Sequence, residues 1–212
     1  MPAILSIIGH EDVPAAEEFL SQTEAADYAS FKLEKRRVEW LSARFAAKKA
    51  YFELEPDSKL SLKQVEVAKA STGEPYLLVE GSRYGAPLSL SHSGGYAVAV
   101  IGRNCRAIGV DIEKIEDRPQ CWADDSFHPA EIPPGAGADH YTELWAKKEA
   151  VLKALGIGLS ADLYDIRFEG GSHKPILFNR ACRAWQSKGS GKFAIRIYSM
   201  PQGYVTCVVT LD

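Results

Sequence analysis

Apolar and polar positions follow two different periodicities along the chain, and each periodicity predicts one kind of element. Residues 31–54 carry apolar side chains at helical spacing among good helix formers and end before Pro56, which predicts an amphipathic helix. Short apolar runs with glycine punctuation follow this helix and predict strands over residues 73–81, 86–95, 96–102 and 107–115.

The same order of elements recurs in the second half of the chain. A proline- and glycine-rich stretch over 127–140 precedes a helical pattern from Tyr141 to Leu155, which Gly156 ends. Apolar runs that predict strands follow over 174–179, 192–199 and 204–211. We therefore expect an α+β fold of two similar halves, residues 1–106 and 107–212, each with a helix packed on a small, mainly antiparallel sheet. The active site is expected in the cleft between these halves.

Composition narrows the class of protein. The 212 residues are 46% hydrophobic, enough for a packed core, and the formal net charge of −3 argues against a nucleic-acid coat or a basic membrane-surface protein. The four cysteines show neither a CxxC pair nor zinc-type spacing. No stretch approaches the roughly 20 apolar residues of a membrane span. We expect a cytoplasmic monomer that binds neither nucleic acid nor membrane.

Two acidic residues stand inside the apolar run IGVDIEKI at 108–115. In a strand, Asp111 and Glu113 share one face. One interpretation is an edge strand with a solvated polar face. The other is a pair of carboxylates that repel each other until a hard divalent cation, such as magnesium, binds between them.

The second predicted helix, YTELWAKKEAVLKAL, places Lys148 in the middle of its apolar arc. Either the lysine stem snorkels to solvent, or its ammonium group points at a bound anion. Glu149 and Lys153 lie at i and i+4, and this spacing alone favours a helix-stabilising ion pair.

Other polar residues suggest phosphate binding. Ser91 and His92 stand beside a glycine pair in LSLSHSGG, where they either hold a phosphate or play a structural role. No G-x-S-x-G motif accompanies them, so a hydrolase is disfavoured. Arg37, Arg44 and Lys48 share one face of the first predicted helix, for which solvated surface is the default interpretation.

Taken in order, SLSHSGG, GVDIEKI and LWAKKEAVLKALG resemble the motifs of the 4′-phosphopantetheinyl transferases, in particular the larger two-lobed type similar to the surfactin synthetase activator. This resemblance implies an enzyme that moves the phosphopantetheine group of coenzyme A to a serine of an apo acyl or peptidyl carrier protein. Adenosine 3′,5′-bisphosphate would be released, and magnesium would be required. A non-catalytic regulator that binds coenzyme A or a carrier protein is the alternative.

The resemblance also assigns roles to residues. It implies a magnesium site at the coenzyme A diphosphate and sites for the other phosphates. The implied magnesium ligands are Asp111, Glu113 and Glu149; the implied phosphate-binding residues are Ser91, His92, Lys148, Lys153, Arg37 and Arg44. Glu149 or Glu131 would accept the serine proton, either directly or through a metal-bound water. One departure from the family pattern is Glu74, where a lysine is common.

Overall fold

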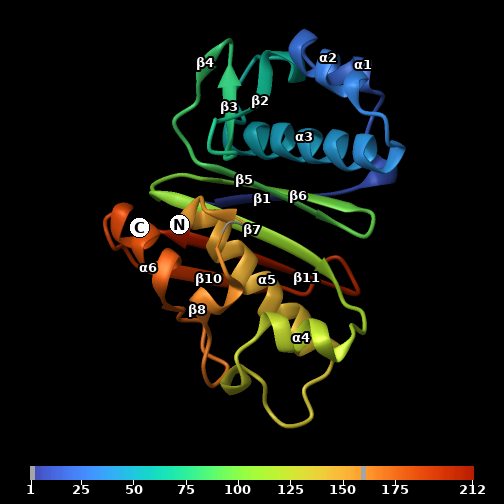
Figure 1. Cartoon of the computed structure of the whole chain (residues 1–212). Coiled ribbons are helices and arrows are strands. Elements are labelled where there is room, and N and C mark those ends of the chain that lie inside the picture. The colour runs from blue at the N-terminus through green and yellow to red at the C-terminus, as the bar shows by residue number, and fades with distance from the viewer. Residues whose placement is uncertain (1–2, 159–160) are drawn as a thin grey trace. The chain divides into compact units, whose positions relative to one another are not determined.

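The computed structural model describes residues 3–158 and 161–212, and the chain divides into two compact units (Figure 1). Unit 1 is Met1–Asn104 and unit 2 is Cys105–Asp212, whereas the sequence placed the boundary after residue 106. Helices pack on small antiparallel sheets, which confirms the predicted α+β class. Among the described residues, no helix is long and apolar enough to cross a membrane.

Unit 1 contains one long helix and two small sheets. Its elements are β1 (Ala3–Gly9), η1 (His10–Asp12), α1 (Ala16–Phe19), α2 (Gln22–Ser30), α3 (Glu34–Leu54), η2 (Leu62–Gln64), β2 (Val65–Lys69), β3 (Pro75–Val79), β4 (Ser82–Arg83), β5 (Leu88–Ser93) and β6 (Tyr96–Gly102). The described strands of this unit pair in the orders β1-β6-β5 and β2-β3-β4.

Unit 2 is built in a similar way around a second long helix. Its elements are β7 (Ala107–Lys114), α4 (Gln120–Ser126), η3 (Pro129–Glu131), α5 (Ala138–Leu155), η5 (Leu163–Asp165), β8 (Ile166–Arg167), β9 (Ile176–Leu177), α6 (Asn179–Ser187), β10 (Phe193–Tyr198) and β11 (Tyr204–Leu211). Its described strands pair in the orders β10-β11-β7 and β8-β9.

The main sheets of the two units share one topology. The strand that opens each unit, β1 or β7, lies beside the strand that closes it, β6 or β11. The closing strand is also paired antiparallel with the strand that precedes it, β5 or β10. The long helix packs on this sheet in both units, α3 on β6 and β1, and α5 on β7 and β11. The repeated order of elements predicted from the sequence is therefore a repeated topology.

Small residues allow the long helix of unit 2 to lie close to its sheet. A Cβ atom added at Gly109 of β7 would lie 1.9 Å from the carbonyl oxygen of Ala150 in α5, so no larger residue fits there. The helix side of this contact consists of the buried residues Ala146, Ala150 and Ala154. This close approach brings the end of β7, which carries Asp111 and Glu113, directly under α5.

Several boundaries and elements differ from the predictions. Helix α3 begins at Glu34 rather than residue 31, and α5 begins at Ala138 rather than Tyr141. The stretch 174–179, predicted as a strand, holds only the two-residue strand β9 and the first residue of α6. Whether a short apolar segment forms a strand depends on whether a partner strand is available. The local sequence pattern does not contain this information.

Candidate active site

The register of β7 points its two acidic side chains toward α5. Asp111 lies opposite Cys207 and Glu113 opposite Val205 on β11. Cys207 and Val205 belong to the core cluster that packs around α5, and directly opposed residues share a face of the sheet. Asp111 and Glu113 therefore share one face of the strand, as their spacing predicted, and this face is directed at α5. Strand β7 is at the edge of its sheet, but Asp111 is buried rather than solvated.

Lys153 of α5 neutralises Asp111. Its Nζ donates to Asp111 Oδ1 at 2.7 Å and to the carbonyl oxygen of Val110 at 3.0 Å. The Asp111 side chain is 5% exposed and that of Lys153 26% exposed. The ammonium thus bonds across to the strand, and its charge also acts on Glu149, with which the sequence favoured an ion pair along the helix.

Glu149 is a buried carboxylic acid whose pKa is raised by its surroundings. Burial, and then the negative charges of Asp111 and Glu113, raise the pKa of Glu149 to about 7, although Lys153 partly opposes them. Glu149 Oε1 is buried and has no hydrogen-bond partner among the described residues. A carboxyl group with these properties exchanges its proton near neutral pH.

Glu113 is held by an arginine that the motifs did not indicate. Arg118 Nη2 donates to Glu113 Oε2 at 3.1 Å, and the guanidinium carbon lies 4.6 Å from the centre of the Trp122 ring and 5.8 Å from that of Trp145. Trp145 stands one turn before Glu149 on α5. Arg118 therefore connects Glu113 to α4 and α5, and an arginine shortly after the acidic motif was the only sequence signal for it.

The donor set suits a hard divalent cation. Asp111, Glu113 and Glu149 are oxygen ligands whose mutual repulsion a cation would relieve, and Glu149 Oε1 is buried without a partner. In the described part of the chain, however, no group of three or more His, Cys, Asp or Glu residues already has the geometry of a metal site. The cations next to Asp111 and Glu113 are supplied by the chain itself, so magnesium binding stays a proposal.

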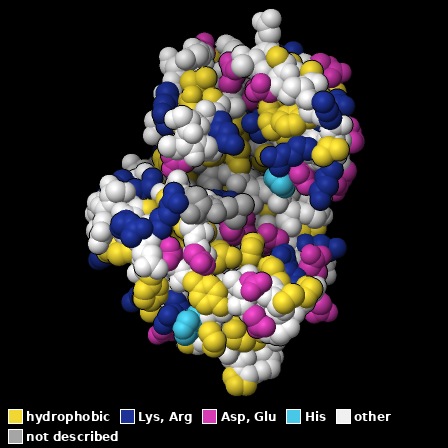
Figure 2. Space-filling view, in the orientation of Figure 1, with side chains coloured by type: hydrophobic (Ala, Val, Ile, Leu, Met, Phe, Trp, Pro, Cys, Tyr) yellow, Lys and Arg dark blue, Asp and Glu magenta, His cyan; other side chains and the backbone are white. Residues whose placement is uncertain are grey.

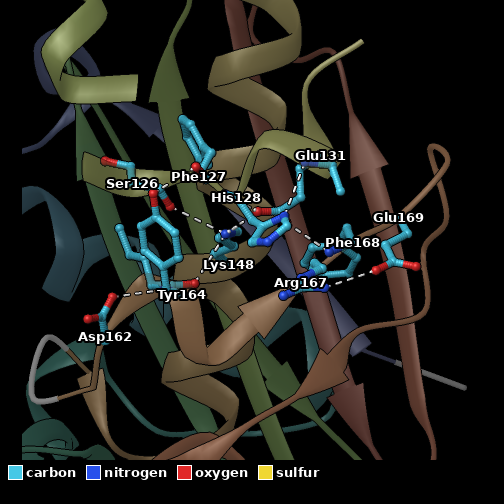
Figure 3. Close-up of polar contacts among 12 residues, drawn as sticks. Ser126, Phe127, His128, Glu131, Lys148, Asp162, Tyr164, Arg167, Phe168 and Glu169 are labelled. Carbon is cyan, nitrogen blue, oxygen red and sulfur yellow. Dashed lines mark hydrogen bonds and ion pairs between the residues drawn. The ribbon is translucent and has the colours of Figure 1, made fainter. Parts of the chain in front are cut away.

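Lys148 and Glu131 form a buried structural pair, and this placement speaks against their expected roles (Figure 3). Lys148 Nζ donates to Glu131 Oε2 at 2.7 Å and to the carbonyl oxygens of Ser126 and Leu163 at 3.3 and 3.1 Å. The Lys148 and Glu131 side chains are both 0% exposed. The three donors of the ammonium group are thereby used within the protein, rather than on a bound phosphate.

Both carboxylate oxygens of Glu131 also accept hydrogen bonds within the protein. Oε1 accepts a bond from the backbone N–H of Phe168 at 2.8 Å, and Oε2 accepts one from that of His128 at 2.9 Å in addition to Lys148. A general base needs an oxygen that can reach a substrate proton. Both oxygens of Glu131 are engaged within the protein, whereas Glu149 Oε1 has no hydrogen-bond partner among the described residues.

The predicted phosphate-binding residues of β5 lie beside α3. His92 is partly exposed, and its Nδ1 lies 3.8 Å from Glu39 Oε1, while Ser91 is buried. Glu39 also lies 3.9 Å from Lys35 Nζ. An acidic residue beside His92 was not predicted, because Glu39 and His92 come from distant segments.

The basic face of α3 is less solvated than expected. Arg37 lies over the Tyr28 ring at 4.6 Å, and Arg44 over the Trp40 ring at 3.6 Å. Burial lowers the pKa of Arg44 to about 10, so this residue remains charged at neutral pH. Lys48, predicted on the same face, is fully buried. Figure 2 shows Lys and Arg side chains beside hydrophobic ones over the α3 region of unit 1.

Comparison with known proteins places unit 2 in one family. The model of the 4′-phosphopantetheinyl transferase superfamily matches residues 107–209. The holo-[acyl-carrier-protein] synthase of Bacillus subtilis (strain 168) is 33% identical over 90 residues, which are 41% of this chain and 74% of that protein. A 4′-phosphopantetheinyl transferase of Bacillus subtilis is 30% identical over 112 residues, and this chain spans 48% of its length.

A solved structure gives a similar partial match. A holo-(acyl-carrier-protein) synthase from Bacillus anthracis, crystallised in complex with coenzyme A, is 27% identical with a TM-score of 0.42. The match covers 47% of this chain and 91% of that one. On the identity and coverage of its sequence relatives, the chain belongs to the 4′-phosphopantetheinyl transferase superfamily.

Proposed function

We propose that this chain transfers the 4′-phosphopantetheine group of coenzyme A to a serine of an apo acyl or peptidyl carrier protein. The observation that carries this proposal is the convergence of Asp111, Glu113 and Glu149 beside Lys153, inside the segment that matches the superfamily. Coenzyme A is the second substrate, and adenosine 3′,5′-bisphosphate is the leaving product. The repeated topology of the two units supports assignment to the larger two-lobed type.

The chain's own residues supply the proton transfer. The serine oxygen attacks the phosphorus atom that bears pantetheine, and the bond from this phosphorus to the bridging oxygen of the leaving bisphosphate breaks. Glu149 accepts the serine proton at Oε1, which has no hydrogen-bond partner among the described residues. Lys153, a partly exposed ammonium beside the carboxylates, stabilises the negative charge that develops on the leaving oxygen.

Magnesium is the cofactor that these carboxylates fit. Asp111, Glu113 and Glu149 would hold the ion, and when bound it would supply charge neutralisation for the diphosphate. In the absence of the ion, Lys153 and Arg118 compensate Asp111 and Glu113. The chain therefore keeps two of the three carboxylates paired until metal and substrate bind.

Residues of unit 1 bind the nucleotide in this proposal. His92 and Ser91 contact the 3′-phosphate, and Arg37 and Arg44 contribute positive charge in a chain whose net charge is −3. Phosphate recognition by arginine is favoured because the guanidinium group is planar, permanently charged and weakly hydrated. Lys148 and Glu131 are left out of the proposed site.

The test is the intact mass of an apo carrier protein after incubation with this chain, coenzyme A and magnesium. We expect the carrier to gain the mass of one phosphopantetheine group at its serine, and the serine-to-alanine carrier to gain none. Binding of coenzyme A without any gain of mass on acyl and peptidyl carriers would contradict the proposal and favour the non-catalytic regulator.

A further inference from the structure

A buried ion pair joins α3 to the segments around it. Lys48 is fully buried, and its Nζ donates to Glu24 Oε2 at 2.5 Å and to the carbonyl oxygens of Phe19 and Leu62 at 2.7 and 3.1 Å. Leaving either charge of such a buried pair without its partner is strongly destabilising. The Lys48–Glu24 pair therefore fixes the rotation of α3 about its own axis relative to α1 and η2.

Glu24 extends this connection to α2 and β2. Its Oε1 accepts a bond from the backbone N–H of Val67 at 2.9 Å, and its Oε2 accepts one from that of Ser21 at 3.1 Å. Ser21 Oγ in turn accepts from the backbone N–H of Glu24, so the carboxylate also caps α2. Glu24 is 2% exposed. Through this single side chain, α2 is held in place beside α3.

Of the two arginines of α3, one stacks on a tryptophan of α3 itself and the other is supported by helix α2. Its Tyr28 ring lies under Arg37, and the centres of the Tyr28 and Trp40 rings are 6.1 Å apart. Arg44 stacks on the Trp40 ring. We call Arg37 and Arg44, with their aromatic supports, the stacked arginines. The Nε atoms of both are buried and have no hydrogen-bond partner among the described residues, whereas Arg37 Nη1 donates to Glu34 Oε2 at 3.4 Å.

Unit 2 contains an equivalent buried lysine–glutamate ion pair on its own long helix. Lys148 of α5 bonds to Glu131 and to the carbonyl oxygen of Leu163, as Lys48 of α3 bonds to Glu24 and to that of Leu62. Glu131 also accepts from a backbone N–H of the chain that follows α5, as Glu24 does from the chain that follows α3. In both units, the anchored helix is the one that carries proposed site residues.

We propose that Lys48 and Glu24 are positioning residues, which hold the stacked arginines in the orientation that binds the phosphate groups of the nucleotide. The inference rests on the proposed function, since it takes coenzyme A as the ligand. Their effect is on affinity rather than on chemistry, because neither residue is among those proposed to act at the reacting phosphorus. Tyr28 is also a positioning residue in this proposal, because its ring contacts Arg37 directly.

The decisive variant is the double substitution Glu24→Gln/Lys48→Met, which keeps the net charge and the approximate size of both side chains. The matched control is Glu53→Gln/Lys49→Met, an exposed pair on the same helix with the same change of charges. Calorimetric titration with adenosine 3′,5′-bisphosphate should show Kd raised about tenfold in the first variant and nearly unchanged in the control. At saturating coenzyme A, kcat should stay within about twofold of wild type, because the lost contact is equal in ground and transition states.

A purely structural role would lower the melting temperature without changing Kd of the folded variant, and that result would overturn the proposal. If the double variant does not fold, the test is Tyr28→Ala, which leaves the Lys48–Glu24 ion pair intact. Tyr28→Ala should raise Kd for adenosine 3′,5′-bisphosphate. Tyr28→Phe, which keeps the ring, should not. Equal Kd values for wild type and Tyr28→Ala would overturn the proposal. A wild-type protein that does not bind adenosine 3′,5′-bisphosphate would contradict the proposed function itself, and the positioning role with it.

Discussion

Replacement of Glu149 by glutamine should make the metal-free protein more stable at pH 8. Burial and two neighbouring carboxylates raise the pKa of Glu149 from 4.5 to about 7. Between these pH values the folded protein keeps a proton that the unfolded chain has released, so the free energy of unfolding falls as pH rises through this window. At about 1.4 kcal/mol for each pH unit, the loss amounts to about 3 kcal/mol at pH 8. Glutamine does not ionise and avoids this loss.

The measurement is thermal and urea unfolding of wild type and Glu149→Gln at pH 4.5 and pH 8, with a chelator present. At pH 8 the variant should gain roughly 6–12 °C in melting temperature, from about 2–4 °C per kcal/mol for a chain of this size. At pH 4.5 the two proteins should differ little. Glu53→Gln, at an exposed position on α3, is the control for the substitution itself and should have a small effect at both pH values. A difference that is the same at both pH values, or a variant less stable at pH 8, would refute the reasoning.

Three further predictions test other parts of the account. Lys148→Met leaves Glu131 buried without its cation and should lower the free energy of unfolding by about 3–5 kcal/mol in urea titrations, whereas a loss near zero would mean that the pair is not structural. His92→Ala should raise KM for coenzyme A with little change in kcat in steady-state assays; a large fall in kcat alone would point to proton transfer instead. Glu74→Lys should tighten coenzyme A binding at low salt, and dephospho-coenzyme A binding less, in calorimetric titrations. Equal affinities would place this residue away from the nucleotide.

Local pattern predicted the elements that have strong periodicity of their own. Helices α3 and α5 and strands β6 and β11 were predicted to within a few residues, because their burial repeats at helical or strand spacing. Strand β1 was not predicted from the sequence. Its pairing partner is β6, far along the chain, and such distant pairing leaves no local trace.

For single residues of the candidate site, too, the sequence predicted local geometry but not contacts with distant segments. The spacing of Asp111 and Glu113 correctly placed both on one face of a strand, because strand geometry alone determines it. Lys148 was correctly found at the centre of an apolar arc, but its partner Glu131 lies in another segment, so the sequence did not distinguish a bound phosphate from a buried ion pair. Lys153 was assigned to Glu149 on its own helix, and its bond across to Asp111 of β7 was not predicted.

The expected position of the active site in a cleft between the halves stays a prediction, as do the magnesium ligands. The carboxylates are the part of the account on which the chemistry depends. Asp111 is the most informative of them, because its pairing with Lys153 joins β7 to α5 beside Glu149.

The most direct test is therefore the initial rate of carrier modification, measured by intact mass across a magnesium titration, for wild type and Asp111→Ala. The account predicts a wild-type rate that rises with magnesium from near zero in chelator to a plateau. In the variant, whose folding is checked by circular dichroism, no measurable rate is expected at any concentration. A variant that approaches the wild-type plateau, or a wild-type rate that is unchanged in chelator, would contradict the assignment of these carboxylates to a metal-dependent transfer.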